Sequence, residues 1–77
     1  NMKCFMCKGD MINKNTNYIL DLDGSIIIIK NVPSLVCEQC GEVFYENEVM
    51  KRIEKIINLF KNALTEIAIV NYDDKVA

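Results

Sequence analysis

The apolar and polar residues follow two different patterns along the chain, and the first is that of paired strands. Two apolar segments, Tyr18 to Leu22 and Ser25 to Ile29, flank Asp23-Gly24. Asp-Gly in this position is typical of a two-residue hairpin turn of type I′, in which both central residues have positive φ. We therefore predict a β-hairpin with strands at about residues 16–22 and 25–32. In the predicted register, Leu22 pairs with Ser25, Leu20 with Ile27 and Tyr18 with Ile29.

This register gives the hairpin two apolar faces. One face carries Tyr18, Leu20, Leu22, Ile27 and Ile29, and the opposite face carries Ile19, Ile26 and Ile28 together with Asn17, Asp21 and Lys30. Three isoleucines are more than we expect on a face that meets only water. Either the C-terminal part of the chain covers these isoleucines, or a partner protein does.

The second pattern is helical and begins after the hairpin. Asn31-Val32-Pro33 is expected to end the second strand, because proline has no N–H to donate, and Val43 to Tyr45 predicts a short strand. Residues 46–62 are then predicted to form an amphipathic helix, because apolar residues recur there at intervals of three or four. Its apolar positions are Val49, Met50, Ile53, Ile56, Ile57, Phe60 and Ala63 or Leu64.

The ends of this helix and the segment after it complete the predicted fold. We expect Asn47 to cap the helix and Glu48 to pair with Arg52 across one turn, on a charged face in contact with solvent. Residues 66–72 are rich in β-branched side chains and predict a C-terminal strand, and residues 73–77 form a polar tail that is expected to fray. The prediction is a single small α+β domain over residues 1–77, in which Asn1 is interpreted as the remnant of an expression tag.

All four cysteines stand in two Cys-x-x-Cys pairs, Cys4 with Cys7 and Cys37 with Cys40. Two such pairs supply the four thiolates of a structural zinc site. No export signal precedes the first pair, which indicates a reducing, cytoplasmic setting where a metal site is favoured over disulfides. We therefore predict one structural zinc ion, which staples a domain too small to rely on its core and whose removal unfolds it. Gly9 and Gly41 are expected to give the two turns their backbone freedom.

The charges and the missing residue types exclude several classes of function. The chain has 9 Lys and Arg against 11 Asp and Glu, a net charge of −2, and four thiolates with one Zn²⁺ would bring it to about −4. This balance disfavours a nucleic-acid-binding module and suits a basic protein partner. Without histidine, and with all four metal positions filled, we do not expect an enzyme. The longest apolar runs, Ile26 to Ile29 and Ile67 to Val70, are far shorter than the ~20 residues of a membrane span.

The order of these features resembles the YgiT-type zinc-finger domain, which forms the N-terminal half of the MqsA-type antitoxins of bacterial type II toxin–antitoxin pairs. The resemblance covers about residues 2–62. It rests on Cys4-x-x-Cys7, the hairpin, the string Val32-Pro33-x-x-x-Cys37-x-x-Cys40-Gly41-Glu42 and the amphipathic helix. It implies a structural zinc on the four cysteines and the binding of a small, basic, ribonuclease-type toxin. The helix-turn-helix domain of those antitoxins has no counterpart after Thr65, so DNA binding is not expected. The chain is either a short stand-alone member, which we favour, or an excised N-terminal half.

The residues expected to contact such a partner are Ile19, Ile26 and Ile28 on the hairpin and Ile67, Ile69 and Tyr72 on the C-terminal strand. The alternatives are that they pack against the chain's own helix or form a homodimer. Two other functions use the same four cysteines. A rubredoxin-like electron carrier would hold iron there, whereas a nucleic-acid-binding zinc ribbon would need exposed aromatic and basic residues, of which the hairpin offers Tyr18 and Lys30.

Overall fold

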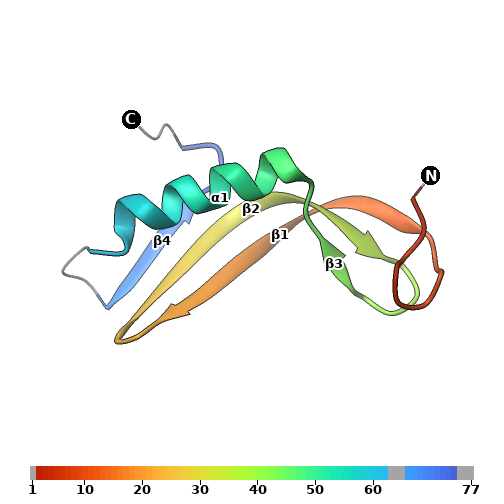
Figure 1. The fold of residues 1–77 in the computed structure, drawn as a ribbon, viewed down its shortest axis with the longest axis horizontal. Helices are drawn as coiled ribbons and strands as arrows, with labels where there is room; N and C mark the ends of the chain where they lie inside the picture. The colour runs from red at the N-terminus through yellow and green to blue at the C-terminus, as the bar shows by residue number, and fades with distance from the viewer. Residues whose placement is uncertain (1, 63–65, 75–77) are drawn as a thin grey trace.

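Paired strands and one helix make up the computed structural model, which describes residues 2–62 and 66–74 (Figure 1). In chain order the elements are β1 (Met11–Leu22), β2 (Ser25–Cys37), β3 (Val43–Phe44), α1 (Asn47–Phe60) and β4 (Ile67–Asn71). The described strands form one mixed sheet, in which β1, β3 and β4 all pair with β2. The α+β class is confirmed, as are the presence of the hairpin, the helix and the C-terminal strand. The first strand, predicted from about residue 16, begins at Met11 instead. Asn1, Ala63, Leu64 and the end of the polar tail lie outside the described residues.

The hairpin register agrees with the prediction, but the turn does not. β1 and β2 are antiparallel, with Leu22 opposite Ser25 and Tyr18 opposite Ile29. Gly24 has a φ of +87°, whereas φ is not positive at the preceding aspartate. A type II turn needs positive φ only at its second central residue, and a type I′ turn needs it at both. The predicted type I′ turn was therefore wrong. Of the two central residues of the turn, only Gly24 has positive φ.

β2 has one residue more than β1 near the middle of the hairpin. Asn31 is the extra residue, between the pairs Tyr18–Ile29 and Thr16–Val32, and its φ is +61°. Such a β-bulge exchanges the two faces of the strand that contains it. As a result, the buried residues in this part of β2 are odd-numbered before Asn31 and even-numbered after it. They are Ile27, Ile29, Val32 and Ser34.

The prediction that Asn31-Val32-Pro33 ends the second strand was wrong, because β2 continues through the bulge to Cys37. β4 pairs with β2 only as far as Lys30, and β3 pairs with it only from Leu35. Pro33 therefore lies in an interval where β2 has no second neighbouring strand among the described residues. Pro33 has no backbone N–H, and this is tolerated here because no second described strand pairs with this part of β2.

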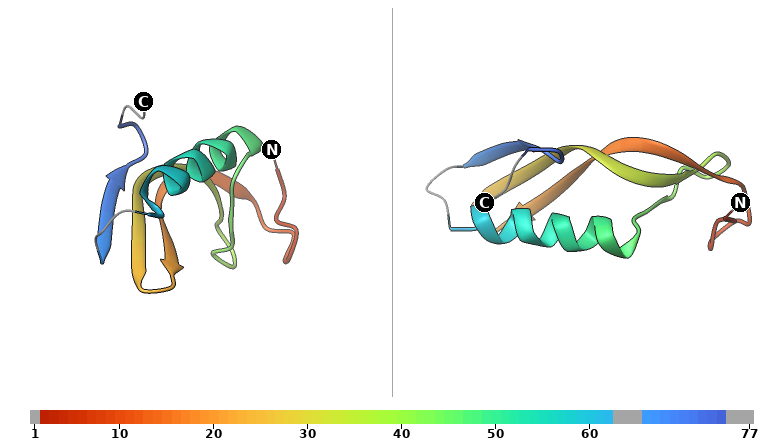
Figure 2. Two further views of the ribbon diagram at one scale, coloured as in Figure 1. Left: turned by 60° about the vertical axis from the view of Figure 1, so that its left-hand side comes forward. Right: turned by 90° about the horizontal axis from the view of Figure 1, so that it is seen from above.

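α1 covers the face of the sheet that carries Ile27 and Ile29 (Figure 2). The buried cluster between helix and sheet consists of Ile27, Ile29, Val32, Ile53, Ile56 and Val70, with Val49, Met50, Ile57 and Phe60 partly buried around it. The helical periodicity of the sequence is therefore confirmed. The residue that caps α1 is Glu46, without a side-chain bond, so the prediction of Asn47 was wrong. The described residues contain no helix long and apolar enough to cross a bilayer.

β4 runs parallel to β2, and α1 lies in the connection that such a pair requires. Arg52 links α1 to the end of β4. Its Nε donates to the carbonyl of Tyr72 and its Nη2 to that of Asp74, each at 2.7 Å, and its guanidinium lies 5.1 Å from the centroid of the Tyr72 ring. The predicted pair with Glu48 was wrong, since Glu48 lies 3.7 Å from Lys51 instead.

The side of the sheet opposite α1 carries isoleucines from three strands, and we call this group the outer isoleucine face. It consists of Ile19, Ile26, Ile28, Ile67 and Ile69. Ile28 on β2 is flanked by Ile19 on β1 and by Ile69 on β4, and Ile26 pairs with Asp21 and Ile67 in the next row. Ile19 and Ile69 are each 64% exposed. No described element covers this face (Figure 2, right).

The packing of α1 predicts a difference between two residues on the same helix. Ile53→Ala should lower the free energy of unfolding of the metal-loaded protein by about 2–5 kcal/mol, because it leaves a cavity in a packed core. Leu59→Ala is the matched control, since Leu59 is 51% exposed, and its effect should stay below about 1 kcal/mol. Urea denaturation followed by far-UV circular dichroism measures both. Equal losses would contradict this account of the core.

Candidate metal centre

The hairpin brings the two cysteine pairs to the same end of the molecule. The first pair lies in the loop before β1, and the second begins at the last residue of β2. Because Met11 is opposite Cys37, the two cysteine loops lie side by side. The N–H of Glu38 also donates to the carbonyl of Asp10 at 2.9 Å, which links one loop to the other.

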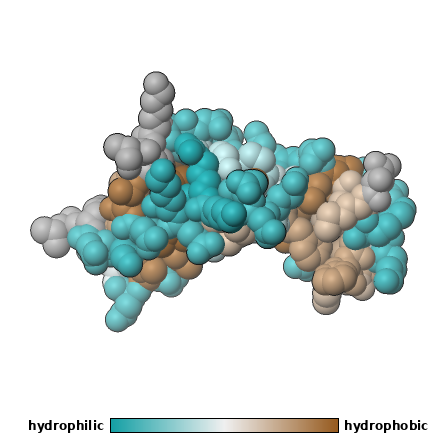
Figure 3. Space-filling model, turned by 45° about the horizontal axis from the view of Figure 1, so that its top comes forward, coloured by the Kyte–Doolittle hydropathy of each residue, from teal (hydrophilic) through white to brown (hydrophobic). Residues whose placement is uncertain are grey.

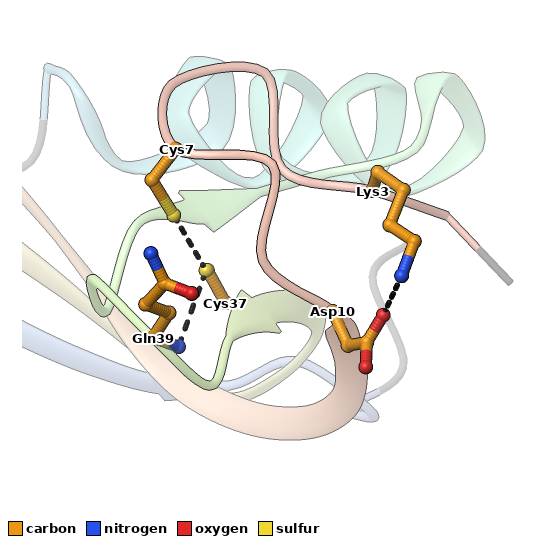
Figure 4. Close-up of polar contacts among 5 residues, drawn as sticks. All are labelled: Lys3, Cys7, Asp10, Cys37 and Gln39. Atoms are coloured by element: carbon orange, nitrogen blue, oxygen red, sulfur yellow. Dashed lines mark hydrogen bonds and ion pairs between the residues drawn. The ribbon is translucent and has the colours of Figure 1, made fainter.

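The sulfurs of Cys4, Cys7, Cys37 and Cys40 all lie within 4.8 Å of one another. The Sγ atoms of Cys7 and Cys37 are 3.4 Å apart (Figure 4), and those of Cys4 and Cys40 are 3.7 Å apart. These distances far exceed the ~2.05 Å of a disulfide, and all four thiols are free. Four sulfurs around a tetrahedral metal, with metal–sulfur distances of about 2.3 Å, would be about 3.8 Å apart. The cluster therefore has the size of a site that could hold one metal ion.

The two cysteine loops share the same backbone hydrogen bonds. In each, the N–H of the residue after the second cysteine donates to the carbonyl of the first cysteine. The N–H of the first cysteine donates to the carbonyl five positions on, and the four distances lie between 2.7 and 3.0 Å. The residue after the second cysteine has positive φ in both loops, 69° at Lys8 and 79° at Gly41. In the first loop the positive φ is thus found at Lys8 and not at Gly9, where we expected the backbone freedom of glycine to be needed. In the second loop it is found at Gly41, as predicted.

Gly9 is required for a different reason, which is the close approach of the two loops. A Cβ added to Gly9 would lie 2.7 Å from the Cβ of Gln39 and 2.9 Å from the Sγ of Cys37. Neither neighbour can yield easily, because one is the first carbon of a side chain and the other is a sulfur of the cluster. A larger residue at this position would push the first cysteine loop away from the second.

Backbone N–H groups point toward the sulfurs, and Cys37 receives two of them. The N–H groups of Gln39 and Cys40 lie 3.3 and 3.4 Å from the Sγ of Cys37, and that of Met6 lies 3.4 Å from the Sγ of Cys4. In the metal-free protein the N–H of Cys40, supported by that of Gln39, outweighs burial and lowers the pKa of the Cys37 thiol to about 6. These N–H groups therefore favour the thiolate form of Cys37, which is the form that binds a cation.

The thiol of Cys40 behaves in the opposite way. The N–H of Glu42 favours its thiolate, but the neighbouring sulfur of Cys7 and partial desolvation within the cluster outweigh this and raise the pKa of Cys40 to about 12. Crowded thiolates repel one another, so the four cannot all be charged unless a cation joins them. Metal binding to this cluster therefore releases protons.

The cysteine end has a small core of its own, separate from the core under α1. Cys4, Met11 and Cys37 are buried together, with Cys7, Leu35 and Phe44 packed around them. None of these residues belongs to the cluster between α1 and the sheet. Hydrophobic residues gather at this end (Figure 3, right), where the exposed ring of Phe5 lies edge-on to Phe44 at 6.5 Å. Because sulfurs form much of this core, a bound metal would contribute most of its stability.

Five of the six residues predicted to contact a partner lie together on the outer isoleucine face. Tyr72 does not, because it lies on the α1 side of the sheet, packs against the core there and stacks with Arg52. Strand alternation could have predicted this position of Tyr72, because residues 67 and 69 share one face of the strand and residue 72 lies on the other. The ion pair of Lys3 with Asp10 (Figure 4), which lowers the pKa of that carboxylate, closes the first cysteine loop and was not predicted.

Comparison with known proteins yields no relative. No family model matches the sequence, no curated protein matches it, and no solved structure matches the fold.

The contact at Gly9 predicts the effect of a single added methyl group. Gly9→Ala should weaken metal affinity by at least about tenfold, because the Cβ displaces a loop that holds two ligands. Gly24→Ala is the matched control, since a Cβ there meets nothing within 4 Å. It should leave metal affinity unchanged and cost about 1–2 kcal/mol through its positive φ. Competition with a chromophoric zinc chelator measures both affinities, and equal affinities would contradict the proposed contact.

The two separate cores change the prediction that metal removal unfolds the whole chain. Chelation should disorder the cysteine end, about residues 3–12 and 37–44, while α1 and the sheet beneath it stay folded, because their core contains no cysteine. Amide hydrogen exchange before and after chelation measures this, and far-UV circular dichroism follows the helix. Complete loss of the helical signal on chelation would show that the two cores are not independent.

Proposed function

We propose that this chain is a zinc-stapled protein-binding module of the antitoxin type, which neutralises a small ribonuclease-type toxin of a bacterial toxin–antitoxin pair. The observation that carries the proposal is the outer isoleucine face. Its five isoleucines come from three strands, and α1 covers the opposite side of the sheet. Monomeric proteins rarely expose contiguous apolar surface unless it binds something.

Zinc is the metal that we propose for the four cysteines. An all-thiolate, tetrahedral donor set is typical of structural zinc sites. Each Cys-x-x-Cys loop would act as a zinc knuckle, in which the N–H groups directed at Cys4 and Cys37 stabilise the negative sulfurs. Because four protein ligands leave no open position for water or substrate, the site would be structural and the protein would have no catalytic activity of its own.

The charge of the chain supports a basic partner. The net charge is −2 before any metal is counted, and Asp21 lies in the same row of the outer isoleucine face as Ile26. A toxin that binds RNA carries Lys and Arg near its active surface, and complementary charge accelerates its association with an acidic antitoxin. The partner would therefore present an apolar patch with basic residues at its margin.

The string that carries the resemblance to the YgiT-type domain coincides with positions where this fold restricts the residue type. Val32 is fully buried in the core under α1, Cys37 and Cys40 contribute sulfurs to the cluster, and Gly41 has a φ of +79°. Pro33 lies where β2 has an open edge. Each of these residues thus has a structural role in this fold, and these roles are compatible with the proposed family.

The test is co-expression of the tagged chain with the product of the adjacent reading frame. We expect a stable complex, one zinc per chain by native mass spectrometry, and inhibition of ribonuclease activity. Ile28→Ser and Ile69→Ser should each weaken the complex at least about tenfold, because they remove buried apolar contacts. Leu59→Ser, which changes an exposed residue of α1, is the matched control.

Two results would count against this function. If the neighbouring gene product neither binds the chain nor cleaves RNA, it is not the proposed toxin, and this result would contradict the antitoxin function. A red, iron-loaded protein would instead support an electron carrier.

A further inference from the structure

We propose that, when no other partner is bound, two copies of this chain form a two-fold dimer through their outer isoleucine faces. The inference goes beyond the proposed function, because self-association requires no toxin and can be measured on the purified protein alone. It rests on the composition of two strands, on the placement of charges around the face, and on the size of the face.

The first observation is that β2 and β4 have the composition of strands covered on both sides. Residues 26–29 are four isoleucines, and residues 67–70 are Ile-Ala-Ile-Val. Continuous apolar runs of this kind are typical of parallel strands buried on both faces, and β2 and β4 are parallel. α1 supplies one cover. The second cover is absent among the described residues, and Ile19 and Ile69 remain 64% exposed.

The second observation is that the polar margins make the face complementary to itself. Asp21 is beside Ile26 at the turn end of the face, and Asp23 follows it in the turn. Lys30 is beside Asn71 at the opposite end. A two-fold axis that runs across the strands brings the Lys30 end of one copy over the Asp21 end of the other, and symmetry repeats this contact. An axis parallel to the strands would place Lys30 over Lys30, which is unfavourable.

The third observation is the size of the face, which predicts a weak and reversible dimer. Three strands about 4.8 Å apart, with rows about 7 Å apart along each strand, give an apolar patch roughly 15 Å across. With its polar margin, each copy would bury about half of the ~800 Å² that a standard interface buries per partner. Interfaces of this size belong to weak, transient complexes, so we expect a dissociation constant in the micromolar range or weaker. It can therefore exchange with a tighter partner that needs the same isoleucines.

Sedimentation equilibrium of the zinc-loaded chain over a concentration series tests the dimer. We expect a reversible monomer–dimer equilibrium, and we expect Ile28→Ser combined with Ile69→Ser to raise the dissociation constant at least tenfold. Leu59→Ser should leave it unchanged. Circular dichroism and zinc content, measured for each variant, separate loss of association from loss of folding. A monomer at every concentration up to about 1 mM, or a dimer that the double isoleucine variant leaves intact, would overturn the proposal.

A charge exchange tests the direction of the two-fold axis. Asp21→Lys alone should weaken the dimer, because it faces Lys30 of the other copy, and Lys30→Glu alone should weaken it for the corresponding reason. The double variant restores opposite charges across the axis and should recover the original dissociation constant within about twofold. The effect of each single change should shrink in high salt. If the double variant is as weak as the sum of the single changes, this arrangement of the two copies is excluded.

Discussion

The antiparallel pairing of β1 with β2 is the interaction on which both ends of the molecule depend. At one end it sets Met11 opposite Cys37 and so brings the two cysteine loops together. At the other end it sets Ile19 opposite Ile28 and so begins the outer isoleucine face. A shift of one residue in this register would turn every side chain of a strand to the other face. The sulfur cluster and the isoleucine face therefore arise from the same set of backbone hydrogen bonds.

The bulge at Asn31 keeps β2 packed against a single core, the one under α1, over a longer stretch. Before it, β2 directs Ile27 and Ile29 under α1, and after it Val32 and Ser34 lie on that same side. Without the extra residue, strand alternation would turn Val32 away from the helix. The buried hydroxyl of Ser34 is satisfied locally, since it donates to the carbonyl of Val32 and lies 2.7 Å from the hydroxyl of Thr16. Asparagine is suited to the bulge because it tolerates positive φ better than most residues.

Local patterns in the sequence predict some of these features and not others. The register followed from the length of the turn and from strand alternation, and the four sulfurs followed from cysteine spacing. The type of turn did not follow, because Asp-Gly fits both type I′ and type II, and the flanking strands decide between them. The bulge was missed because Asn31 before Val32-Pro33 also reads as a strand end. The role of Arg52 was missed because its partners are backbone carbonyls 20 and 22 residues away, which no helical pattern contains.

The separation of the two cores bears on what a metal does for a docking surface. Between them, β1 is largely exposed from Ile12 to Asn15, so backbone pairing and few buried contacts hold this middle part of the hairpin. Along β2 the core under α1 extends from Val32 toward the turn and includes Ile29 and Ile27. The outer isoleucine face lies on the opposite side of this same stretch of the sheet. The isoleucines are thus held by α1 and β4, on a part of the sheet that contains no metal ligand. Loss of a metal from the cysteine end would therefore act first on that end of the hairpin, whereas the stretch of sheet that carries the isoleucine face is packed against α1.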